Sequence, residues 1–153
     1  MTIHHLFPPL LALAAAGSAL HAQSTGPTSI DLDTAAITPT SAQNAAIRRA
    51  AAADIKEFNH PQRDDWRVAR ADLNDDGRAD LLVQYTDAST FCGSLGCGGV
   101  IVMATATGYA ARTISLPNFM SGVHILATRH HGMHDLRFDD AHYVFTWNGK
   151  QYR

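Results

Sequence analysis

The densest group of candidate metal ligands in the sequence is the stretch 72–80, which reads Asp-Leu-Asn-Asp-Asp-Gly-Arg-Ala-Asp. Calcium takes about six to eight oxygen ligands at roughly 2.3–2.6 Å, from carboxylate, amide and backbone carbonyl groups. In a tight loop, alternate residues can turn their side chains inward, and Gly77 permits the sharp turn. The spacing predicts a calcium site formed by the side chains of Asp72, Asn74, Asp76 and Asp80 and by the carbonyl oxygen of Arg78.

A metal-free turn is the alternative for this stretch, because Asp, Asn and Gly are favoured in turns in any case. The charge density favours the cation. Four carboxylates in nine residues are offset by Arg78 alone, and like charges held close together repel unless a cation joins them. The twelfth position counted from Asp72 is Val83, not the glutamate of an EF-hand, so the loop is expected between strands instead of helices.

The stretch 72–80, followed by Leu81-Leu82-Val83, resembles the strand–loop–strand calcium motif of FG-GAP and VCBS-type repeats. The resemblance implies that the five positions named above hold calcium. One copy of the motif in 153 residues excludes the propeller that those repeats build. Residues 66–153 resemble small exported bacterial proteins with one such loop, a Cys-Gly-…-Gly-Cys segment (92–97), a His-Gly-x-x-Asp-Leu segment (131–136) and a closing Gly-Lys-x-Tyr (149–152). Some periplasmic members of this group serve as lysozyme inhibitors or immunity proteins, which implies a protein partner.

The two cysteines of the chain, Cys92 and Cys97, enclose a Gly- and Ser-rich segment. Two thiols this close in an exported chain favour a disulfide, and their spacing fits neither a C-x-x-C redox motif nor a four-ligand zinc site. So small a ring restricts the unfolded chain little, so the bond should stabilise the fold by at most about 2–4 kcal/mol. Its main effect would be to fix a hairpin tip. There Ser94 and Leu95 are candidate partner contacts, unless Leu95 folds back onto the sheet.

Five of the nine histidines lie between His124 and His142. The run 130–135 could supply imidazoles and a carboxylate to zinc or copper, but its spacing matches no established metal motif and Gly132 indicates a turn. We therefore expect a polar loop, with His131 and His134 as further candidate partner contacts.

The sequence contains no convincing catalytic constellation. Ser94 lies in Gly-Ser-Leu-Gly, which is not the G-x-S-x-G elbow, and no glycine-rich phosphate loop follows a strand. The net charge of −2 gives no electrostatic footprint for nucleic acid or an anionic membrane.

We expect a non-enzymatic binding protein, with a peptidoglycan hydrolase as the favoured partner. The alternatives are a structural calcium domain, and a small hydrolase that uses His131 or His134 with Asp135.

The elements that would position these groups are mostly β. Alanine-rich residues 41–58 predict one helix, because Ile47, Ala51, Ile55 and Phe58 form a single apolar stripe. Short segments rich in β-forming residues, separated by turn residues, predict strands near 66–71, 80–86, 99–105, 109–116, 122–128, 133–138 and 141–147. Asn148-Gly149 predicts a hairpin turn. The expected fold is α+β and mostly β: an antiparallel meander of about seven strands with one N-terminal helix.

The N-terminal 22 residues have the anatomy of a secretory signal peptide. The apolar run 10–16 is followed by small residues, which suits cleavage after Ala19 or Ala22. The run is shorter than the about 20 apolar residues that span a membrane, so we expect a periplasmic or secreted protein without an anchor. Residues 23–40, rich in Thr, Ser, Pro and Gly, are predicted to be a flexible linker, and residues 41–153 a single domain.

Overall fold

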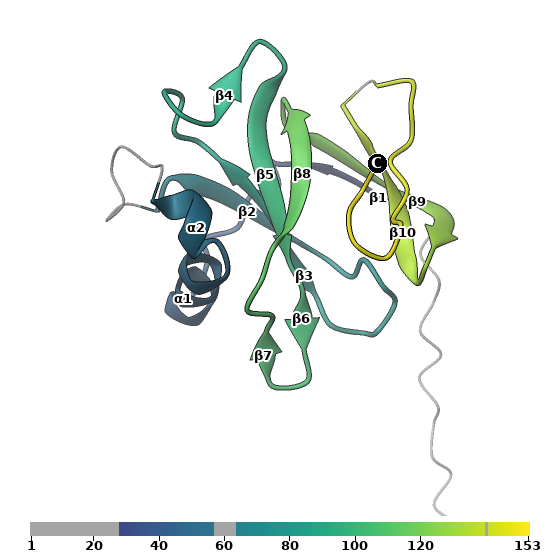
Figure 1. The fold of residues 1–153 in the computed structure, drawn as a ribbon, viewed down its shortest axis with the longest axis horizontal. Helices are drawn as coiled ribbons and strands as arrows, with labels where there is room; N and C mark the ends of the chain where they lie inside the picture. Colours follow the sequence, from purple (N-terminus) through teal and green to yellow (C-terminus); the bar gives the residue numbers. More distant parts are fainter. Residues whose placement is uncertain (1–27, 57–63, 140) are drawn as a thin grey trace, which may run out of the picture.

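The computed structural model describes residues 28–56, 64–139 and 141–153 of the chain (Figure 1). The predicted signal peptide, the first residues of the predicted linker and Phe58 lie outside these residues. The described elements are β1 (Thr28–Asp31), α1 (Ser41–Ala50), α2 (Ala52–Ile55), β2 (Trp66–Ala71), β3 (Asp80–Tyr85), β4 (Cys92–Gly93), β5 (Gly96–Val102), β6 (Ala104–Thr105), β7 (Gly108–Tyr109), β8 (Ile114–Phe119), β9 (Gly122–His130) and β10 (Met133–Phe138).

The strands form two main antiparallel sheets. The larger sheet follows the predicted meander: β2 pairs with β3, β3 with β5, and β5 with β8, while the short β4 pairs with the start of β5. The smaller sheet has the order β1-β9-β10. A small β6–β7 hairpin connects β5 to β8 along the chain and projects from the lower end of the larger sheet in Figure 1. The predicted fold class, mostly β with antiparallel sheets and N-terminal helical structure, is confirmed.

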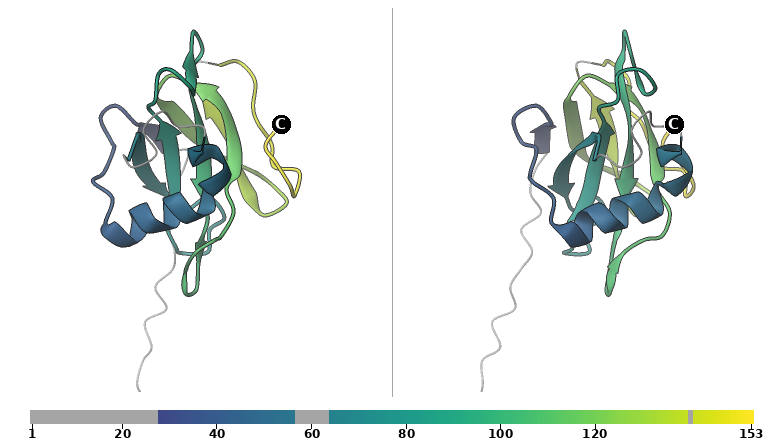
Figure 2. Two further views of the ribbon diagram at one scale, coloured as in Figure 1. Left: turned by 60° about the vertical axis from the view of Figure 1, so that its left-hand side comes forward. Right: turned by 90° about the vertical axis from the view of Figure 1, so that its left-hand side faces the viewer.

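The molecule has three layers, with the larger sheet in the middle (Figure 2). Both faces of β3 are buried. Leu82 packs in the core between the two sheets, whereas Leu81 and Val83 pack with Ile47 and Ala51 of the helical segment on the other face. This arrangement explains why β3 is apolar at consecutive positions: a strand covered on both sides has no solvent face.

The helical segment begins as its sequence dictates and ends earlier than predicted. Thr40 caps α1: its hydroxyl accepts the N–H of Gln43 at 3.2 Å, and the Gln43 side chain accepts the N–H of Thr40 at 2.9 Å. The predicted single helix 41–58 is divided at Ala51 into α1 and α2. The predicted apolar stripe holds at Ile47 and Ala51, which are buried against the sheet.

The N-terminal boundary of the domain is earlier than the predicted linker allows. β1 pairs with β9 over four residues, Ile30 and Leu32 are buried in the core between the sheets, and Ile37 forms a bridge with Val68. Residues 28–40 are therefore part of the folded domain and not a linker, because β1 adds an edge strand to the smaller sheet and the apolar side chains Ile30 and Leu32 are buried in the core.

Ten strands are formed within the described residues, against about seven predicted. The expected strands 99–105 and 109–116 are each divided, because the chain turns into the β6–β7 hairpin. The expected strand 141–147 is reduced to isolated bridges, Leu136 with Phe145 and Trp147 with Tyr152. The second bridge closes the turn predicted at Asn148-Gly149.

Among the described residues, no helix has the length and apolar character to cross a membrane.

Candidate functional site

The aspartate loop lies where the sequence predicts it, between β2 and β3, and is anchored at both ends. Leu73 is fully buried in the core between the sheets. Asp80 is also fully buried, and its carboxylate accepts the N–H of Leu73 at 3.0 Å and of Ala104 at 2.7 Å. These bonds link the loop to β3 and to the start of β6.

The side chains of Asp72, Asn74 and Asp76 converge inside the loop. The carboxylate of Asp72 accepts the N–H of Asp76 at 3.2 Å and of Gly77 at 2.8 Å. The Asn74 amide donates to Asp76 at 3.0 Å and accepts the Asp76 N–H at 3.3 Å. Gly77 has a φ of 79°, a conformation that favours glycine. Three of the predicted ligand side chains therefore share one turn.

The electrostatics of the loop reflect its crowded carboxylates. Burial raises the pKa of Asp80, and the charges of Asp76 and Asp72 raise it further, against the lowering effect of its two N–H donors. Burial also works to raise the pKa of Asp76, but the N–H of Arg78, the Asn74 amide and the Arg78 guanidinium at 2.7 Å hold it below its usual value. Asp80 thus carries an electrostatic penalty that a bound cation would relieve.

Asp75, in the same loop, points away from the convergent side chains. With a φ of 56°, it contacts the β9–β10 hairpin: Arg129 at 2.7 Å and His134 at 2.9 Å. The hydrogen bond from His134 is the main reason that the pKa of Asp75 is lowered. The second ring nitrogen of His134 lies 2.6 Å from the carbonyl oxygen of Leu126. Because both ring nitrogens face acceptors, both hydrogen bonds form together only when the ring is protonated.

The histidines that the structure describes in the segment 124–142 make separate contacts. His130 pairs with the buried carboxylate of Asp135 at 2.8 Å, and His131 lies exposed in the hairpin turn with a φ of 47°. Asp135 is therefore bonded to His130, and not to His131 or His134, the partners expected for a hydrolase. Within residues 28–56, 64–139 and 141–153, no three His, Cys, Asp or Glu side chains are grouped so as to hold a metal.

The predicted disulfide is confirmed: Cys92 and Cys97 are directly opposite in the β4–β5 hairpin, with an S–S distance of 2.03 Å. Ser94 and Leu95 form its tip, and Leu95 is 74% exposed, so it does not fold back onto the sheet. Gly96 has a φ of 90°, and a Cβ there would lie 2.0 Å from the carbonyl oxygen of Phe119. The tip is therefore held closely against the end of β8.

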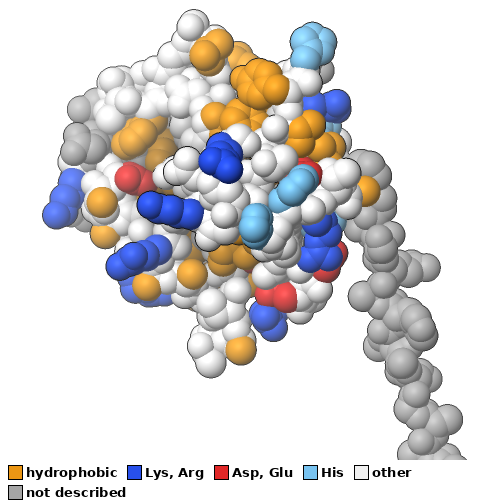
Figure 3. All heavy atoms as spheres, turned by 45° about the vertical axis from the view of Figure 1, so that its right-hand side comes forward, with side chains coloured by type: hydrophobic (Ala, Val, Ile, Leu, Met, Phe, Trp, Pro, Cys, Tyr) orange, Lys and Arg blue, Asp and Glu red, His pale blue; other side chains and the backbone are white. Residues whose placement is uncertain are grey.

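A pocket that the sequence did not predict lies beside this tip. Its cavity volume is about 170 Å³. Figure 3 shows hydrophobic side chains gathered at the upper end of the face that it views. The lining comes from the disulfide tip, β8, the end of β10 and the C-terminal segment: Leu95, Pro117, Asn118, Phe138, Asp139, Ala141, Tyr143 and Phe145. Only the pairing of segments far apart in sequence brings these residues together.

Asp139 fixes the base of this region. Its carboxylate accepts three N–H groups, from Met120 at 2.7 Å, Ser121 at 3.0 Å and Gly122 at 2.8 Å. Burial works to raise the pKa of Asp139, and the three donors outweigh it, so the pKa lies below its usual value. Asp139 thus clamps the turn between β8 and β9, which adjoins the pocket.

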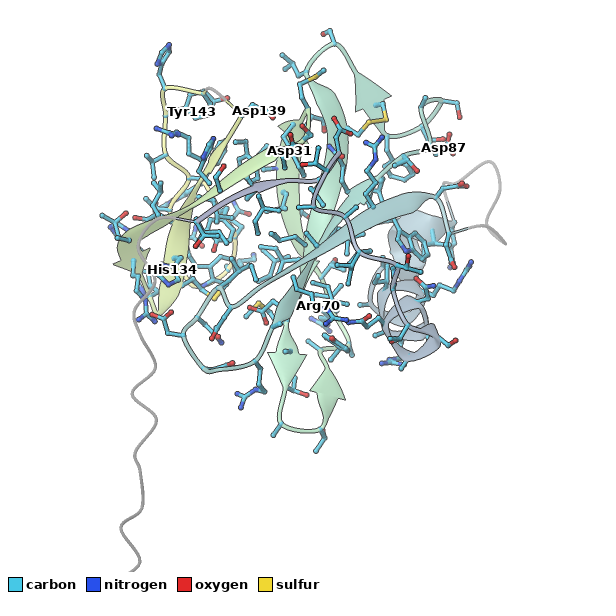
Figure 4. All side chains as sticks on the ribbon, turned by 180° about the vertical axis from the view of Figure 1, so that it is seen from behind. Asp31, Arg70, Asp87, His134, Asp139 and Tyr143 are labelled. Carbon is cyan, nitrogen blue, oxygen red and sulfur yellow. A yellow bond between two sulfur atoms is a disulfide. The ribbon has the colours of Figure 1, made fainter. Side chains whose placement is uncertain are left out.

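The two predicted partner-contact regions lie apart: the Leu95 tip belongs to the larger sheet and adjoins the end of β10, whereas His131 lies in the turn of the β9–β10 hairpin. In Figure 4, Asp139 and Tyr143 lie near one end of the β9–β10 hairpin, away from His134. β9 has 9 residues, which at about 3.3 Å per residue places its ends roughly 25 Å apart. Leu95 and His131 therefore cannot contact one small partner loop together.

Comparison with known protein families, with curated proteins and with solved structures finds no match to this chain.

Proposed function

We propose that the chain is an exported, non-enzymatic protein-binding domain, that its partner is a peptidoglycan hydrolase of the cell wall, and that calcium stabilises the fold. A disulfide is typical of proteins in oxidising compartments, which agrees with export to the periplasm or beyond. The convergent aspartate loop supports the calcium role.

The observation that carries the proposal is the exposure of Leu95 on a fixed tip. Leu95 is the most exposed of the large hydrophobic side chains that the structure describes, at 74%. It projects from a turn that the disulfide closes. The backbone of Gly96 in this turn packs closely against the end of β8. A side chain presented on a rigid tip loses little conformational entropy when it enters a cleft, so more of its contact energy contributes to affinity.

Inhibition assays on a panel of peptidoglycan hydrolases test the proposed partner. We expect the wild type to inhibit at least one enzyme. Leu95→Asp should weaken inhibition about 10-fold or more, since it removes an apolar anchor and introduces a charge. Exchange of both cysteines for serine should also weaken inhibition, because it removes the restraint on the tip. No inhibition by the wild type, or equal inhibition by all three proteins, would contradict the proposal.

The calcium role is tested by thermal unfolding. A ligand that binds only the native state stabilises by RT ln(1 + [L]/Kd), so added calcium should raise the Tm of the wild type. Asp76→Ala should abolish the rise, because Asp76 lies at the centre of the convergent side chains. Asp75→Asn is the matched control: Asp75 faces Arg129 and His134, so this variant should keep the calcium-dependent rise. Identical curves for the wild type in chelator and in calcium would show that the loop is a metal-free turn.

A further inference from the structure

The turn that joins Trp147 to Tyr152 contains the sequence Asn148-Gly149. In this dipeptide the side-chain amide of asparagine reacts readily with the backbone, because glycine has no side chain to hinder the attacking nitrogen. The reaction requires an attacking N–H that is not hydrogen-bonded, open space around it and a polarised side-chain carbonyl. The C-terminal turn of this chain has all three features.

The attacking nitrogen belongs to Gly149, which is exposed. A Cβ built at this position would have nothing within 4 Å, so the approach is open. Its φ of 90° is a conformation that favours glycine. Among the hydrogen bonds of the residues that the structure describes, none has the N–H of Gly149 as its donor. Solvent hydroxide can therefore remove this proton without breaking an internal bond.

The side-chain carbonyl of Asn148 lies between two donors. Its Oδ1 accepts the backbone N–H of Lys150 and that of Gln151, each at 2.9 Å. The backbone of Asn148 is also held, because its N–H donates to the Gln151 carbonyl at 3.1 Å. Two N–H groups directed at one carbonyl oxygen form an oxyanion hole. They polarise the Asn148 carbonyl and stabilise the negative charge that develops on Oδ1 when Cγ is attacked.

We propose that Asn148 is a self-modification site, at which the turn promotes conversion of the asparagine to aspartate and isoaspartate. The Gly149 nitrogen loses its proton to hydroxide and forms a bond to Cγ, and the negative charge moves to Oδ1. The bond from Cγ to Nδ2 then breaks, and the amide nitrogen takes a proton from water and leaves as ammonia, which restores the hydroxide. A water molecule opens the resulting succinimide at either of its carbonyl groups.

The two products differ in their effect on the fold. Aspartate leaves the backbone unchanged, and its carboxylate can accept the same two N–H groups as stronger, charge-assisted bonds. Isoaspartate adds a methylene group to the backbone, which disrupts the bridge between Trp147 and Tyr152. Tyr152 is buried in the core, and its hydroxyl donates to the His134 carbonyl at 2.8 Å. The isoaspartyl form therefore loosens the C-terminal segment from the core.

Hydrogen bonds to Oδ1 have two opposing effects on this reaction. They activate Cγ towards attack, and they also restrain rotation of the Asn148 side chain towards Gly149. The proposal requires activation to be the larger effect. Removal of one donor must then slow the conversion, whereas it would accelerate the conversion if the restraint were larger.

Lys150→Pro removes one of the two donors, because proline has no N–H. Lys150 is not among the non-glycine residues with a positive φ, so the fixed φ of proline has the sign that the turn requires. Lys150→Ala is the matched control, since it removes the side chain and keeps the N–H. Thermal unfolding of both variants verifies that they are folded.

The purified proteins are incubated at pH 7, and peptide mapping by mass spectrometry follows the fraction in which an acid has replaced the Asn148 amide. We expect Lys150→Pro to convert at least about 5-fold more slowly than the wild type, since loss of one oxyanion donor slows enzymes by about 10²–10³. Lys150→Ala should convert at the wild-type rate. Asn44, Asn74 and Asn118 are internal references, because each precedes a residue with a side chain, and they should remain unconverted over the same period.

A synthetic peptide of residues 145–151 measures the conversion without the folded turn, and it should react more slowly than the protein. Equal or faster conversion in Lys150→Pro than in the wild type would overturn the proposal, as would faster conversion in the peptide than in the protein. Should Lys150→Pro fail to fold, the comparison of the peptide with the wild-type protein decides. These outcomes depend neither on calcium nor on inhibition of a hydrolase, so they are independent of the proposed function.

Discussion

At the scale of single residues, the aspartates of this domain have distinct roles that follow from their partners. Asp80 is buried and bonded to two backbone N–H groups, Asp75 ties the loop to β9 and β10 through Arg129 and His134, and Asp139 clamps a turn through three N–H groups. The direction of each pKa shift follows from the balance between burial and donors. The pKa of Asp80 is raised, whereas the pKa values of Asp75 and Asp139 are lowered.

The clamp at Asp139 leads to a prediction at the residue scale. Because the folded pKa of Asp139 lies below its unfolded value, near 3.8, the carboxylate contributes stability above that pH. The contribution is lost as the pH falls through the lower folded pKa. Asp139→Asn should reduce the free energy of unfolding at pH 7 by about 1–3 kcal/mol, since an amide oxygen replaces a charged acceptor of three hydrogen bonds.

Urea unfolding at pH 7 and at pH 3 measures this contribution. The difference in stability between wild type and Asp139→Asn should shrink at the lower pH, where the wild-type carboxylate begins to protonate. Asp33→Asn is a suitable control, because Asp33 pairs with Arg67 at a surface position and such pairs contribute at most about 1 kcal/mol. A constant difference at both pH values would show that the charge of Asp139 is not what stabilises the turn.

At the scale of elements, the β4–β5 hairpin combines a disulfide with glycine positions that fix its placement. The ring closed by Cys92 and Cys97 is short, with a sequence separation of 5. The bond therefore removes little entropy from the unfolded chain, and it stabilises the folded state by only about 2 kcal/mol. The hairpin is positioned instead by close backbone approach. A Cβ at Gly96 would meet the Phe119 carbonyl, and one at Gly99 would lie 2.6 Å from the Val83 carbonyl.

Alanine substitution tests this positioning. Gly96→Ala should lower the free energy of unfolding by about 2–4 kcal/mol, because it places a Cβ at a positive φ and against backbone atoms that cannot move freely. Gly93→Ala, directly opposite in the same hairpin, has nothing within 4 Å of its Cβ and should change stability by no more than about 0.5 kcal/mol. Chemical denaturation of both variants gives the comparison. Equal losses would show that the tip is free to shift away from β8.

At the scale of the whole molecule, residues 28–40 hold the smaller sheet against the rest of the domain. β1 occupies one edge of that sheet, Leu32 is fully buried between the sheets, and its N–H donates to the Ser121 carbonyl at 2.9 Å. The segment therefore joins the smaller sheet to the β8–β9 turn that borders the pocket.

This role predicts that Leu32→Ala costs about 2–5 kcal/mol of stability, the range for loss of a buried leucine side chain. Thr38→Ala, at an exposed position of the same segment, should stay within about 0.5 kcal/mol of the wild type. Thermal or urea unfolding of the two variants suffices. If Leu32→Ala were as stable as the wild type, the segment would be the linker that its composition first indicates.

The sequence alone determined the structural features that depend only on residues close together in the chain. Four features follow from backbone preferences and spacing over a few positions. They are the apolar run of β3, the helix that starts after Thr40, the convergence of alternate side chains in the aspartate loop and the pairing of Cys92 with Cys97. Such preferences act within one turn or one strand, so a short window of sequence contains the information.

Only the tertiary structure decided which distant segments meet. The pairing of β1 with β9, the contact of Asp75 with Arg129 and His134, and the pocket that Leu95 shares with Tyr143 each join residues more than 40 positions apart. These contacts depend on the register and stacking of whole sheets, where many side chains are buried together. No local pattern around any one of these residues encodes its partner, because the free energy that selects the partner comes from the packing of the entire core.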